Sequence, residues 1–554
     1  MTPAMESPCI PFREIPHTTA LFTAFLDEFQ RVSGYYAHPP TEAGIDAAAR
    51  NVKHDPAVRQ SVVEVLREQN RVFSTGSTDR ADEATERNLT RLANGAVAIV
   101  TGQQVGLFTG PAYSFYKAIS AVRCAEEATR RGIDAVPVFW LATEDHDLVE
   151  VNHSIWNTRA GIARYELPPK AEDAGRRVGE VKLGHGIREI VAEAAESLQG
   201  DFAGEIARAL RECYTPEETY GSAFGKFLAR TMAGQGMILI DPLDARFHEL
   251  SASVYHRALD EADSLRDALI GRGKHLEDAG YHAQVKVTGE STLLFYNMNG
   301  RREPLRSHNH KYFAGRKAFT REELSAAIES APLDFTPNAL LRAVVQDSLL
   351  PTAAYIGGPA EVAYMAQSQV VYQAILGRMP AILPRASFTI IEEPVRRLLA
   401  KYGLTIQDIL QGQKNVRAKM EQKVLPRALA RRFEKDEKAL RKMLLGYTGP
   451  LETLDATLLG ARNSADKKML HQFLKLKQKA ARAEGLRNGV LNRHERILLD
   501  SLLPHHALQE RSLSALPFLA AYGPGFLSDL AHAIPAPGSQ EKSLCAQQHH
   551  IVSV

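Results

Sequence analysis

The sequence predicts an α/β protein that has a parallel sheet and a separate helical arm. At residues 96–152 a β-branched run, a glycine-rich loop, a helical stretch and a second apolar run follow one another, which is the order of a βαβ unit. A strand-like run that opens through a glycine pair into a helix occurs again at residues 349–364. Residues 400–500 instead place apolar side chains at a spacing close to the coiled-coil period.

The composition fits a large protein with two or three compact units. The chain has 554 residues, of which 44% are hydrophobic, enough for a substantial core. Its 67 basic and 65 acidic residues give a net charge of +2, so no overall field attracts nucleic acid or a membrane surface. The sequence contains no run of about 18 apolar residues and no apolar signal core near its start. We therefore expect a protein that neither spans a membrane nor carries an obvious export signal.

The cysteines are widely scattered, at Cys9, Cys124, Cys213 and Cys545. No two of them have the spacing of a zinc site, and the pattern also argues against a disulfide framework. Such cysteine usage suits a reducing compartment, so we expect the protein in the cytoplasm.

Residues 1–95 are predicted to be mostly helical scaffold, and the βαβ unit follows. The glycines of its loop at residues 102–111 let the backbone turn sharply or come close to a ligand, and a helix start attracts anions. This loop matches neither the Walker A sequence nor the dinucleotide fingerprint, and a turn that uses glycine only for geometry remains the alternative. The candidate binding residues are Gly102, Gln103, Gln104, Gly106, Thr109 and Gly110, and the helix that follows carries Lys117.

Four consecutive ionisable residues follow the second strand of the unit: Glu144, Asp145, His146 and Asp147. Charges at the end of a buried strand are costly unless they are solvated, paired or bound to a ligand. His146 beside carboxylates could act as a general base or could bind an unknown metal with them. Parallel strands end at the same edge of a sheet, so this cluster and the glycine loop should meet there. A solvated acidic corner is the alternative, and Asn152 is a further candidate for binding.

Two insertions between strands are expected, at about residues 155–235 and 280–330. In the second, Asn299-Gly300 lies between two strand-like runs, which is a strong signal for a two-residue hairpin turn. The hairpin carries basic residues that could attract an anionic substrate or could simply be solvated. They are Arg301, Arg302, Arg306 and Lys311.

A second glycine loop opens a helix in the same way as the first. Gly357 and Gly358 would allow a backbone anion site or the close approach of a substrate. Glu361 in the first turn would repel phosphate, so we expect it to bind an ammonium or hydroxyl group. The other candidates in this region are Gln346 and Asp347 before the strand-like run, Tyr364 in the helix, and Arg385 at the end of the strand that follows.

Residues 396–503 are predicted to form a helical coiled-coil hairpin. The apolar seam of its second helix runs through Leu454, Leu458, Ala461, Ala465, Met469, Phe473, Leu476, Ala480 and Ala483. Because Glu and Asp alternate with the many Lys and Arg residues, we favour dimerisation through this arm over electrostatic binding of RNA. Residues 504–554 are expected to return to the core, formed by residues 1–395, and to end in a flexible tail from Pro535.

Two long motifs resemble a known family. The block VTGQQVGLFTGPAYSFYKAIS, followed by PVFWLATEDHDLVEVNH, is similar to the bacillithiol-biosynthesis enzymes that add cysteine to glucosaminyl-malate. The resemblance continues through the second glycine loop nearly to the end of the chain. It implies a Rossmann-like core akin to class I aminoacyl-tRNA synthetases and nucleotidyltransferases, with connecting insertions and a coiled-coil arm used for homodimerisation.

The activity that this resemblance implies is a ligase reaction that forms an amide bond between cysteine and the amino group of glucosaminyl-malate. A carboxylate is a poor acyl donor, so activation by ATP or another adenine nucleotide, with Mg²⁺, is expected. Lys117 or Arg385 would neutralise developing charge, and His146 or a neighbouring carboxylate would take the proton of the amine. Related cysteine-activating synthetases hold the thiol with zinc, which the cysteine pattern here does not support.

A hypothesis from a different class is a non-catalytic nucleotide- or RNA-binding protein that kept a synthetase-like fold. The sequence lacks the Lys-Met-Ser-Lys-Ser motif that clamps triphosphate in class I synthetases, which weakens the role transferred to Arg385. Cysteine-dependent consumption of nucleotide would separate the two hypotheses.

Overall fold

The computed structural model describes residues 8–74, 82–308, 311–487, 489–533 and 548–554. The chain divides into two compact units. Unit 1 consists of Met1–Thr389 and Glu510–Val552, and unit 2 consists of Ile390–Gln509 with Ser553–Val554.

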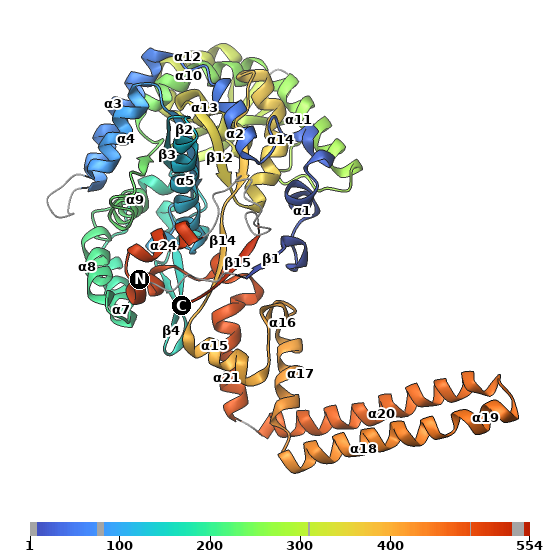
Figure 1. The fold of residues 1–554 in the computed structure, drawn as a ribbon. Coiled ribbons are helices and arrows are strands. Elements are labelled where there is room, and N and C mark those ends of the chain that lie inside the picture. The colour runs from blue at the N-terminus through green and yellow to red at the C-terminus, as the bar shows by residue number, and fades with distance from the viewer. Residues whose placement is uncertain (1–7, 75–81, 309–310, 488, 534–547) are drawn as a thin grey trace. The chain divides into compact units, whose positions relative to one another are not determined.

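The centre of unit 1 is a parallel sheet of five strands in the order β13-β12-β2-β3-β6. Strands β12, β2 and β3 of this sheet are labelled in Figure 1. The strands are β2 (Val97–Gln103), β3 (Ala135–Leu141), β6 (Ile238–Ile240), β12 (Thr352–Gly357) and β13 (Ala381–Pro384). The chain runs outward from β2 through β3 to β6, and then returns to the other side of β2 to form β12 and β13. In such open sheets the ligand crevice lies at the carboxyl ends of the strands where this order reverses. The predicted α/β fold with a parallel Rossmann-like sheet is confirmed.

Helices cover this sheet and form most of the rest of unit 1. α5 (Tyr113–Arg130) packs against β2 and β3, and α14 (Pro359–Ile375) packs against β12 and β13. Strands β3, β12 and β13 are buried along their whole length, as expected for a sheet covered on both faces. The other helices of unit 1 are α1 (Ala20–Asp27), α2 (Glu42–Arg50), α3 (Pro56–Ser74), α4 (Glu83–Ala93), α6 (Leu148–Val151), α7 (Ile187–Ser197), α8 (Ala203–Cys213), α9 (Tyr220–Thr231), α10 (Ala245–Asp260), α11 (Ala262–Asp278), α12 (Arg321–Ser330), α13 (Ala339–Leu349), α22 (Gln509–Ser512), α23 (Leu516–Tyr522) and α24 (Gly525–Ala533).

Both insertions contain antiparallel strands, and the first also contains helices α7, α8 and α9. β4 (His153–Thr158) and β5 (Gly161–Glu166) form a hairpin directly after the acidic cluster. A second antiparallel sheet has the order β10-β9-β8-β7-β11. Its strands are β7 (Ser291–Met298), β8 (Arg301–His308), β9 (Lys311–Ala314), β10 (Lys317–Phe319) and β11 (Phe335–Pro337). Asn299 and Gly300 both have positive φ between β7 and β8, so the predicted two-residue turn is confirmed.

The two ends of the chain meet in a small sheet of order β1-β15-β14, in which β1 (Cys9–Ile10) pairs with β15 (His549–Ser553). The third strand is β14 (Ser387–Ile391). The last residues therefore form a strand, and the rest of the tail expected to be flexible, residues 535–547, lies outside the described residues. Cys9 is disulfide-bonded, which corrects the expectation from the cysteine pattern, while Cys124 and Cys213 are free and buried.

Unit 2 is helical and contains the arm. Its helices are α15 (Glu393–Tyr402), α16 (Ile406–Leu410), α17 (Gln413–Val424), α18 (Arg427–Gly446), α19 (Thr448–Leu454), α20 (Leu458–Arg487) and α21 (Gly489–Leu502). α18 and α20 run side by side as a hairpin, with the rings of Phe433 and Phe473 5.6 Å apart (Figure 1). The expected turn between them is longer than predicted because α19 occupies it.

Within the described parts of the chain, no helix combines the length and the apolar character needed to cross a membrane.

Candidate active site

A cavity of about 850 Å³ lies in unit 1 at the edge where β2, β3 and β12 end. Strands β7 and β8 of the second insertion also contribute to its wall. Gln104 follows β2, and its Nε2 donates to Oδ2 of Asp145 at 2.7 Å and to Oε2 of Glu150 at 2.8 Å. The predicted convergence of the glycine loop and the acidic cluster is therefore confirmed. The predicted residues that line the cavity are Gly102, Gln103, Gln104, Lys117, Glu144, Asp145, His146, Gly358, Glu361, Tyr364 and Arg385.

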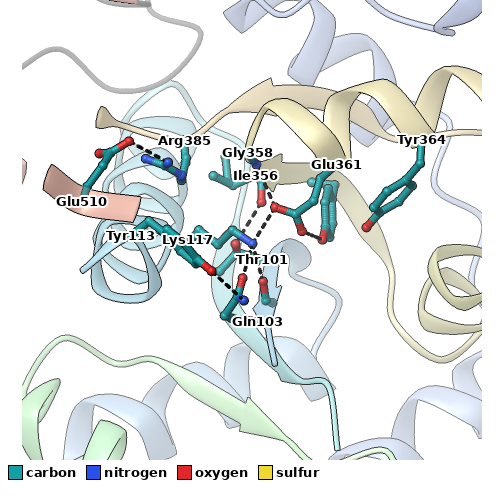
Figure 2. Close-up of polar contacts among 12 residues, drawn as sticks. Thr101, Gln103, Tyr113, Lys117, Ile356, Gly358, Glu361, Tyr364, Arg385 and Glu510 are labelled. Carbon is teal, nitrogen blue, oxygen red and sulfur yellow. Dashed lines mark hydrogen bonds and ion pairs between the residues drawn. The ribbon is translucent and has the colours of Figure 1, made fainter. Parts of the chain in front are cut away.

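Lys117 joins the two glycine loops (Figure 2). Its Nζ lies 2.5 Å from Oε2 of Glu361 and donates to the Gly102 carbonyl at 2.8 Å and to Oε1 of Gln103 at 2.7 Å. Burial lowers the pKa of Lys117, and the adjacent Glu361 carboxylate opposes that effect. The amine is held by three partners, so its charge acts mainly within the wall of the cavity.

The Glu361 carboxylate has partners on both oxygens. Oε2 also accepts from the Gly358 N–H at 2.7 Å, and Oε1 accepts from the Tyr355 hydroxyl at 2.6 Å. Burial alone would raise the pKa of Glu361, but Lys117 and these donors outweigh it and the pKa is lowered. A substrate ammonium or hydroxyl group, the ligand expected for Glu361, would have to compete with these protein partners.

Arg342 on α13 is a cavity residue that the sequence analysis missed. Its Nη2 donates to the hydroxyls of Tyr364 at 3.0 Å and Tyr355 at 3.3 Å, and its Nη1 donates to Oε1 of Gln346 at 3.1 Å. None of these described hydrogen-bond partners is a carboxylate. The helical spacing of Arg342 and Gln346, four residues apart, was the available signal, because such residues share one helix face.

Glu144 is a buried carboxylate in the cavity wall, only 6% exposed. Burial raises the pKa of Glu144 to about 7. Three guanidinium groups oppose that rise in pKa, those of Arg302, Arg177 and Arg342. Near neutral pH this carboxyl group can therefore both accept and release a proton, which suits a general base.

His146 faces a guanidinium group from the second insertion. Nη1 of Arg302 lies 3.0 Å from Nδ1 of His146, and Arg302 also stacks on the Phe295 ring at 3.8 Å. A guanidinium can only donate, so Nδ1 accepts and a neutral His146 carries its hydrogen on Nε2. In this arrangement Nδ1 is occupied by Arg302 and Nε2 carries the hydrogen, so His146 is a poorer candidate for the general base than Glu144.

Asp145 is held as an anion. Burial would raise its pKa, but hydrogen bonds from the Gln104 amide and the His146 backbone N–H, with the charge of Arg302, together lower the pKa well below its usual range. The His146 backbone N–H donates to Oδ1 at 2.7 Å. Asp145 therefore contributes a fixed negative charge, not a proton acceptor, at neutral pH.

Arg385 is anchored by the C-terminal segment. Its Nη2 donates to Oε1 of Glu510 at 2.7 Å, and the guanidinium lies 5.4 Å from the centre of the Tyr113 ring. Arg511, the residue after Glu510, also lines the cavity, and the sequence analysis did not single it out. The return of the C-terminal segment to unit 1 therefore completes this wall.

Part of the first glycine loop faces elsewhere. Gly106 and Gly110 line a smaller neighbouring cavity of about 230 Å³. The Thr109 hydroxyl donates to the Phe108 carbonyl at 2.6 Å, and its backbone N–H donates to the Tyr214 hydroxyl at 3.1 Å. These contacts hold the turn in place, and they give Thr109 a structural partner instead of a place in the main cavity.

Asp147 and Asn152 also have local structural partners. Oδ1 of Asp147 accepts from the Glu150 N–H at 3.2 Å and so caps α6. Nδ2 of Asn152 donates to the Leu167 carbonyl at 3.2 Å and to Glu166 at 3.3 Å, which secures the β4–β5 hairpin. Neither residue lines the main cavity.

Gln346 and Asp347, which were also candidates for binding, do not line the cavity, although Gln346 accepts from Arg342 in its wall. They belong to α13, which enters β12 at its amino end, whereas the cavity is at the carboxyl end. Oδ2 of Asp347 accepts from the Tyr372 hydroxyl at 2.5 Å inside the core. Gly357 is also absent from the cavity wall, and its carbonyl accepts from the Arg385 N–H at 2.9 Å.

The described residues contain no group of three or more His, Cys, Asp or Glu side chains arranged to hold a metal ion.

Comparison with known proteins identifies the family. The family model described as "Bacillithiol biosynthesis BshC, N-terminal Rossmann-like domain" matches residues 5–386, and that described as "Bacillithiol biosynthesis BshC, C-terminal coiled-coil domain" matches residues 388–543. The chain belongs to the BshC family. The resemblance found in the sequence motifs is thus confirmed.

Curated BshC relatives match over nearly their whole length. "Putative cysteine ligase BshC" of Koribacter versatilis is 39% identical over 525 residues, covering 95% of this chain and 97% of that protein. The proteins of the same name from Solibacter usitatus and Salinibacter ruber are 35% and 32% identical, and each covers more than nine-tenths of both chains. A solved structure titled as a putative arginyl-tRNA synthetase from Campylobacter jejuni aligns with 87% of this BshC-family chain at 10% identity. Its TM-score is 0.24, at which the likeness supports no conclusion.

Proposed function

We propose that this BshC-family chain is a ligase that joins the carboxyl group of cysteine to the amino group of glucosaminyl-malate. The observation that supports it is one cavity whose wall contains both a proton-accepting carboxylate, Glu144, and the cations Lys117, Arg342 and Arg385. Amide formation needs a base for the attacking amine and positive charge for the activated carboxyl group. The names of the curated relatives agree with this reaction class.

Arg342 is the cation best suited to an oxyanion. Lys117 and Arg385 each lie beside a carboxylate, that of Glu361 and of Glu510 respectively. The described hydrogen-bond partners of Arg342 are neutral, so its charge is not cancelled by direct contact. Such a guanidinium can donate two parallel hydrogen bonds to the oxygens of a carboxylate or phosphate group, which is called bidentate binding.

ATP or another adenine nucleotide would supply the activating group, with Mg²⁺. Mg²⁺ usually binds through substrate phosphates and one or two carboxylates, so it needs no protein cage.

We also propose that the arm mediates a homodimer. Several large apolar side chains of α18 to α20 remain exposed in the single chain, among them Met443, Tyr447, Leu454, Met469 and Leu476. Exposed apolar rows at coiled-coil spacing are typical of an interface with another helix.

The test is a reconstituted reaction with the purified full-length chain. Cysteine, glucosaminyl-malate and ATP together should give the cysteinyl thiol, detected by mass spectrometry, and omission of any one should abolish it. Glu144→Gln should lower the rate at least about 10²-fold, because the base is lost. Glu329→Gln, which alters an exposed glutamate of α12, should have the wild-type rate.

Failure of that reaction would favour the other hypothesis, a nucleotide- or RNA-binding protein without catalysis. Binding of ATP or RNA to the same purified chain, in the absence of any cysteine-dependent product, would then replace the ligase proposal. In cells, deletion of the gene should cause glucosaminyl-malate to accumulate if the ligase proposal is correct.

A further inference from the structure

A buried polar pair lies behind Glu144, on helix α10. His248 is 2% exposed and Tyr255 is 1% exposed, and neither lines the cavity. They are seven residues apart, or two helical turns, and so share one face of the helix. Nδ1 of His248 lies 3.1 Å from the Tyr255 hydroxyl oxygen, and Nε2 lies 3.6 Å from Oε1 of Glu144. Nε2 has no hydrogen-bond partner in the described residues.

The protonation states of the pair follow from burial. Burial raises the pKa of Tyr255 well above its ordinary value, so the phenol keeps its hydrogen. Burial, followed by the charge of Arg177, lowers the pKa of His248 to about 4, so the imidazole is neutral at pH 7. A neutral imidazole accepts at one nitrogen and donates at the other. If Tyr255 donates to Nδ1, the imidazole hydrogen is on Nε2 and faces Glu144.

We propose that His248 positions the Glu144 carboxylate for the proton that leaves the substrate's ammonium group, and that Tyr255 fixes the imidazole tautomer required. This inference rests on the proposed function. In the step, an N–H bond of the ammonium group breaks and an O–H bond forms on Glu144, which leaves the nitrogen with the lone pair that attacks the activated carboxyl carbon. His248 stays neutral throughout, so it orients the base and does not transfer the proton.

The pair explains why an unpartnered imidazole nitrogen is kept in the core. A buried N–H without an acceptor costs about 1–3 kcal/mol, and a shift of a few tenths of an ångström by Glu144 would satisfy it. An ionised carboxylate accepts such a bond more strongly than a carboxylic acid does. His248 therefore favours the ionised, proton-accepting form of Glu144.

Other charged groups also act on this site. Arg302, Arg177 and Arg342 lower the pKa of Glu144, and Asp241 raises it. The backbone carbonyls of Phe335, Pro242 and Pro332 lie beside the His248 ring. These groups remain in place when His248 or Tyr255 is replaced, so a change in the pH profile on replacement reports on the pair itself.

The experiment compares His248→Leu, His248→Gln and Tyr255→Phe in the full-length chain, with kcat and KM for the amine measured across the pH range around 7. His248→Leu should lower kcat roughly 10–100-fold with KM unchanged, because a misplaced base slows the step and not the binding. The rising limb of the pH profile should move to higher pH. His248→Gln, which keeps a donor near Nε2, should recover part of the rate, and Tyr255→Phe should show a smaller effect of the same kind.

A second measurement does not need turnover. Isotope-edited infrared spectroscopy, with Glu144→Gln to assign the carboxyl band, should place the titration of Glu144 at higher pH in His248→Leu and Tyr255→Phe. An unmoved titration would overturn the inference, as would a loss of kcat with an unchanged pH profile and no recovery in His248→Gln. If the wild type forms no product, the proposed function fails, while the infrared titration still decides whether His248 acts on Glu144. Tyr255→Phe removes a single oxygen atom. If His248→Leu does not fold, the titration of Glu144 in Tyr255→Phe decides the inference in its place.

Discussion

Lys117 Nζ and Glu361 Oε2 lie 2.5 Å apart and tie the helix that follows β2 to the helix that follows β12. These two strands are neighbours at the point where the strand order of the sheet reverses. The pair therefore fixes the relative position of the two glycine loops on which the cavity depends.

Loss of either partner should destabilise unit 1. Lys117→Met leaves a largely buried Glu361 without its counter-charge, which should cost about 3–5 kcal/mol in the free energy of unfolding. The double variant Lys117→Met/Glu361→Gln should recover much of that loss, because no unpaired charge remains. Urea denaturation of the wild type, both single variants and the double variant measures the coupling, and strictly additive effects would contradict a direct interaction.

Glu144→Gln should change stability in a pH-dependent way. The carboxyl pKa rises from an ordinary value of 4.5 to about 7 on folding, so the folded state holds the proton more tightly than the unfolded state. Protonation of Glu144 therefore contributes to the free energy of unfolding. This contribution is fully present below pH 4.5 and is lost as pH rises through about 7. Above that pH the buried charge costs on the order of 3 kcal/mol, which Gln avoids.

Thermal or urea unfolding at pH 8 and at pH 5 checks this prediction. The variant should be more stable than the wild type at the higher pH, with the difference shrinking toward the lower pH, while its ligase activity falls at both. A variant that is less stable at pH 8 would show that the Glu144 charge is well compensated in the folded protein.

The edge of the sheet at which the cavity lies could be predicted from the sequence. The first glycine loop and the acidic cluster each follow an apolar run directly, and parallel strands end at the same edge of a sheet. Gln346 and Asp347 were selected as binding residues but do not line the cavity, because the helix that contains them was not recognised in the sequence. α13 begins after the Asn338 cap and continues to Leu349, which carries both residues to the opposite end of β12. A residue's distance along the chain from a strand does not tell which end of the strand it approaches.

Arg302 shows a second limit on what the sequence can predict. Its position on a hairpin was predictable from Asn299-Gly300, but its contact with His146 depends on how the whole insertion packs over the sheet. No local pattern contains that information. The contact between Arg385 and Glu510 depends in the same way on segments that are far apart in sequence.

Gly102→Ala should damage the sheet itself. A Cβ at this position would lie 2.7 Å from the Trp140 carbonyl oxygen, which belongs to the neighbouring strand β3. The backbone must shift, so we expect a loss of about 1–3 kcal/mol or more in stability. Gly271→Ala in α11 is the control, since a Cβ there meets nothing within 4 Å and should stabilise the helix by up to about 1 kcal/mol. Equal stability of the two variants in urea denaturation would contradict the close approach.

Glu510→Gln should weaken the wall that holds Arg385. Glu510 is 1% exposed and accepts from Arg385 at 2.7 Å, from the Ser387 hydroxyl at 2.8 Å and from the Phe388 N–H at 2.9 Å. The variant leaves a buried guanidinium without its counter-charge, so stability should fall by about 3–5 kcal/mol at neutral pH. The pKa of Glu510 is lowered on folding, since burial is outweighed by Arg385, so this contribution is lost as pH falls through the folded pKa.

The difference between wild type and Glu510→Gln in urea denaturation should therefore shrink in acid. If Arg385 binds substrate, kcat/KM for the nucleotide should fall as well. An unchanged kcat/KM together with lower stability would restrict Arg385 to a structural role.

The arm offers a prediction about assembly. Leu476 on α20 is 57% exposed and Met469, seven residues earlier, is 47% exposed, so both lie on one face of the helix. Leu476→Glu would place a charge in the proposed dimer interface, and desolvating an unpaired charge there should cost several kcal/mol of association free energy. Light scattering after gel filtration should then give the mass of a single 61.1 kDa chain, where the wild type gives twice that mass.

Lys475→Glu is the matched control for this arm variant, because it adds the same side chain at the adjacent exposed position, about 100° away around the helix. It should leave the wild-type mass unchanged if the Leu476 face makes the contact. Equal dissociation of both variants would point to a general charge effect on the arm. A wild type that is monomeric at micromolar concentration would remove the dimer proposal, and the exposed leucine and methionine would then need another partner.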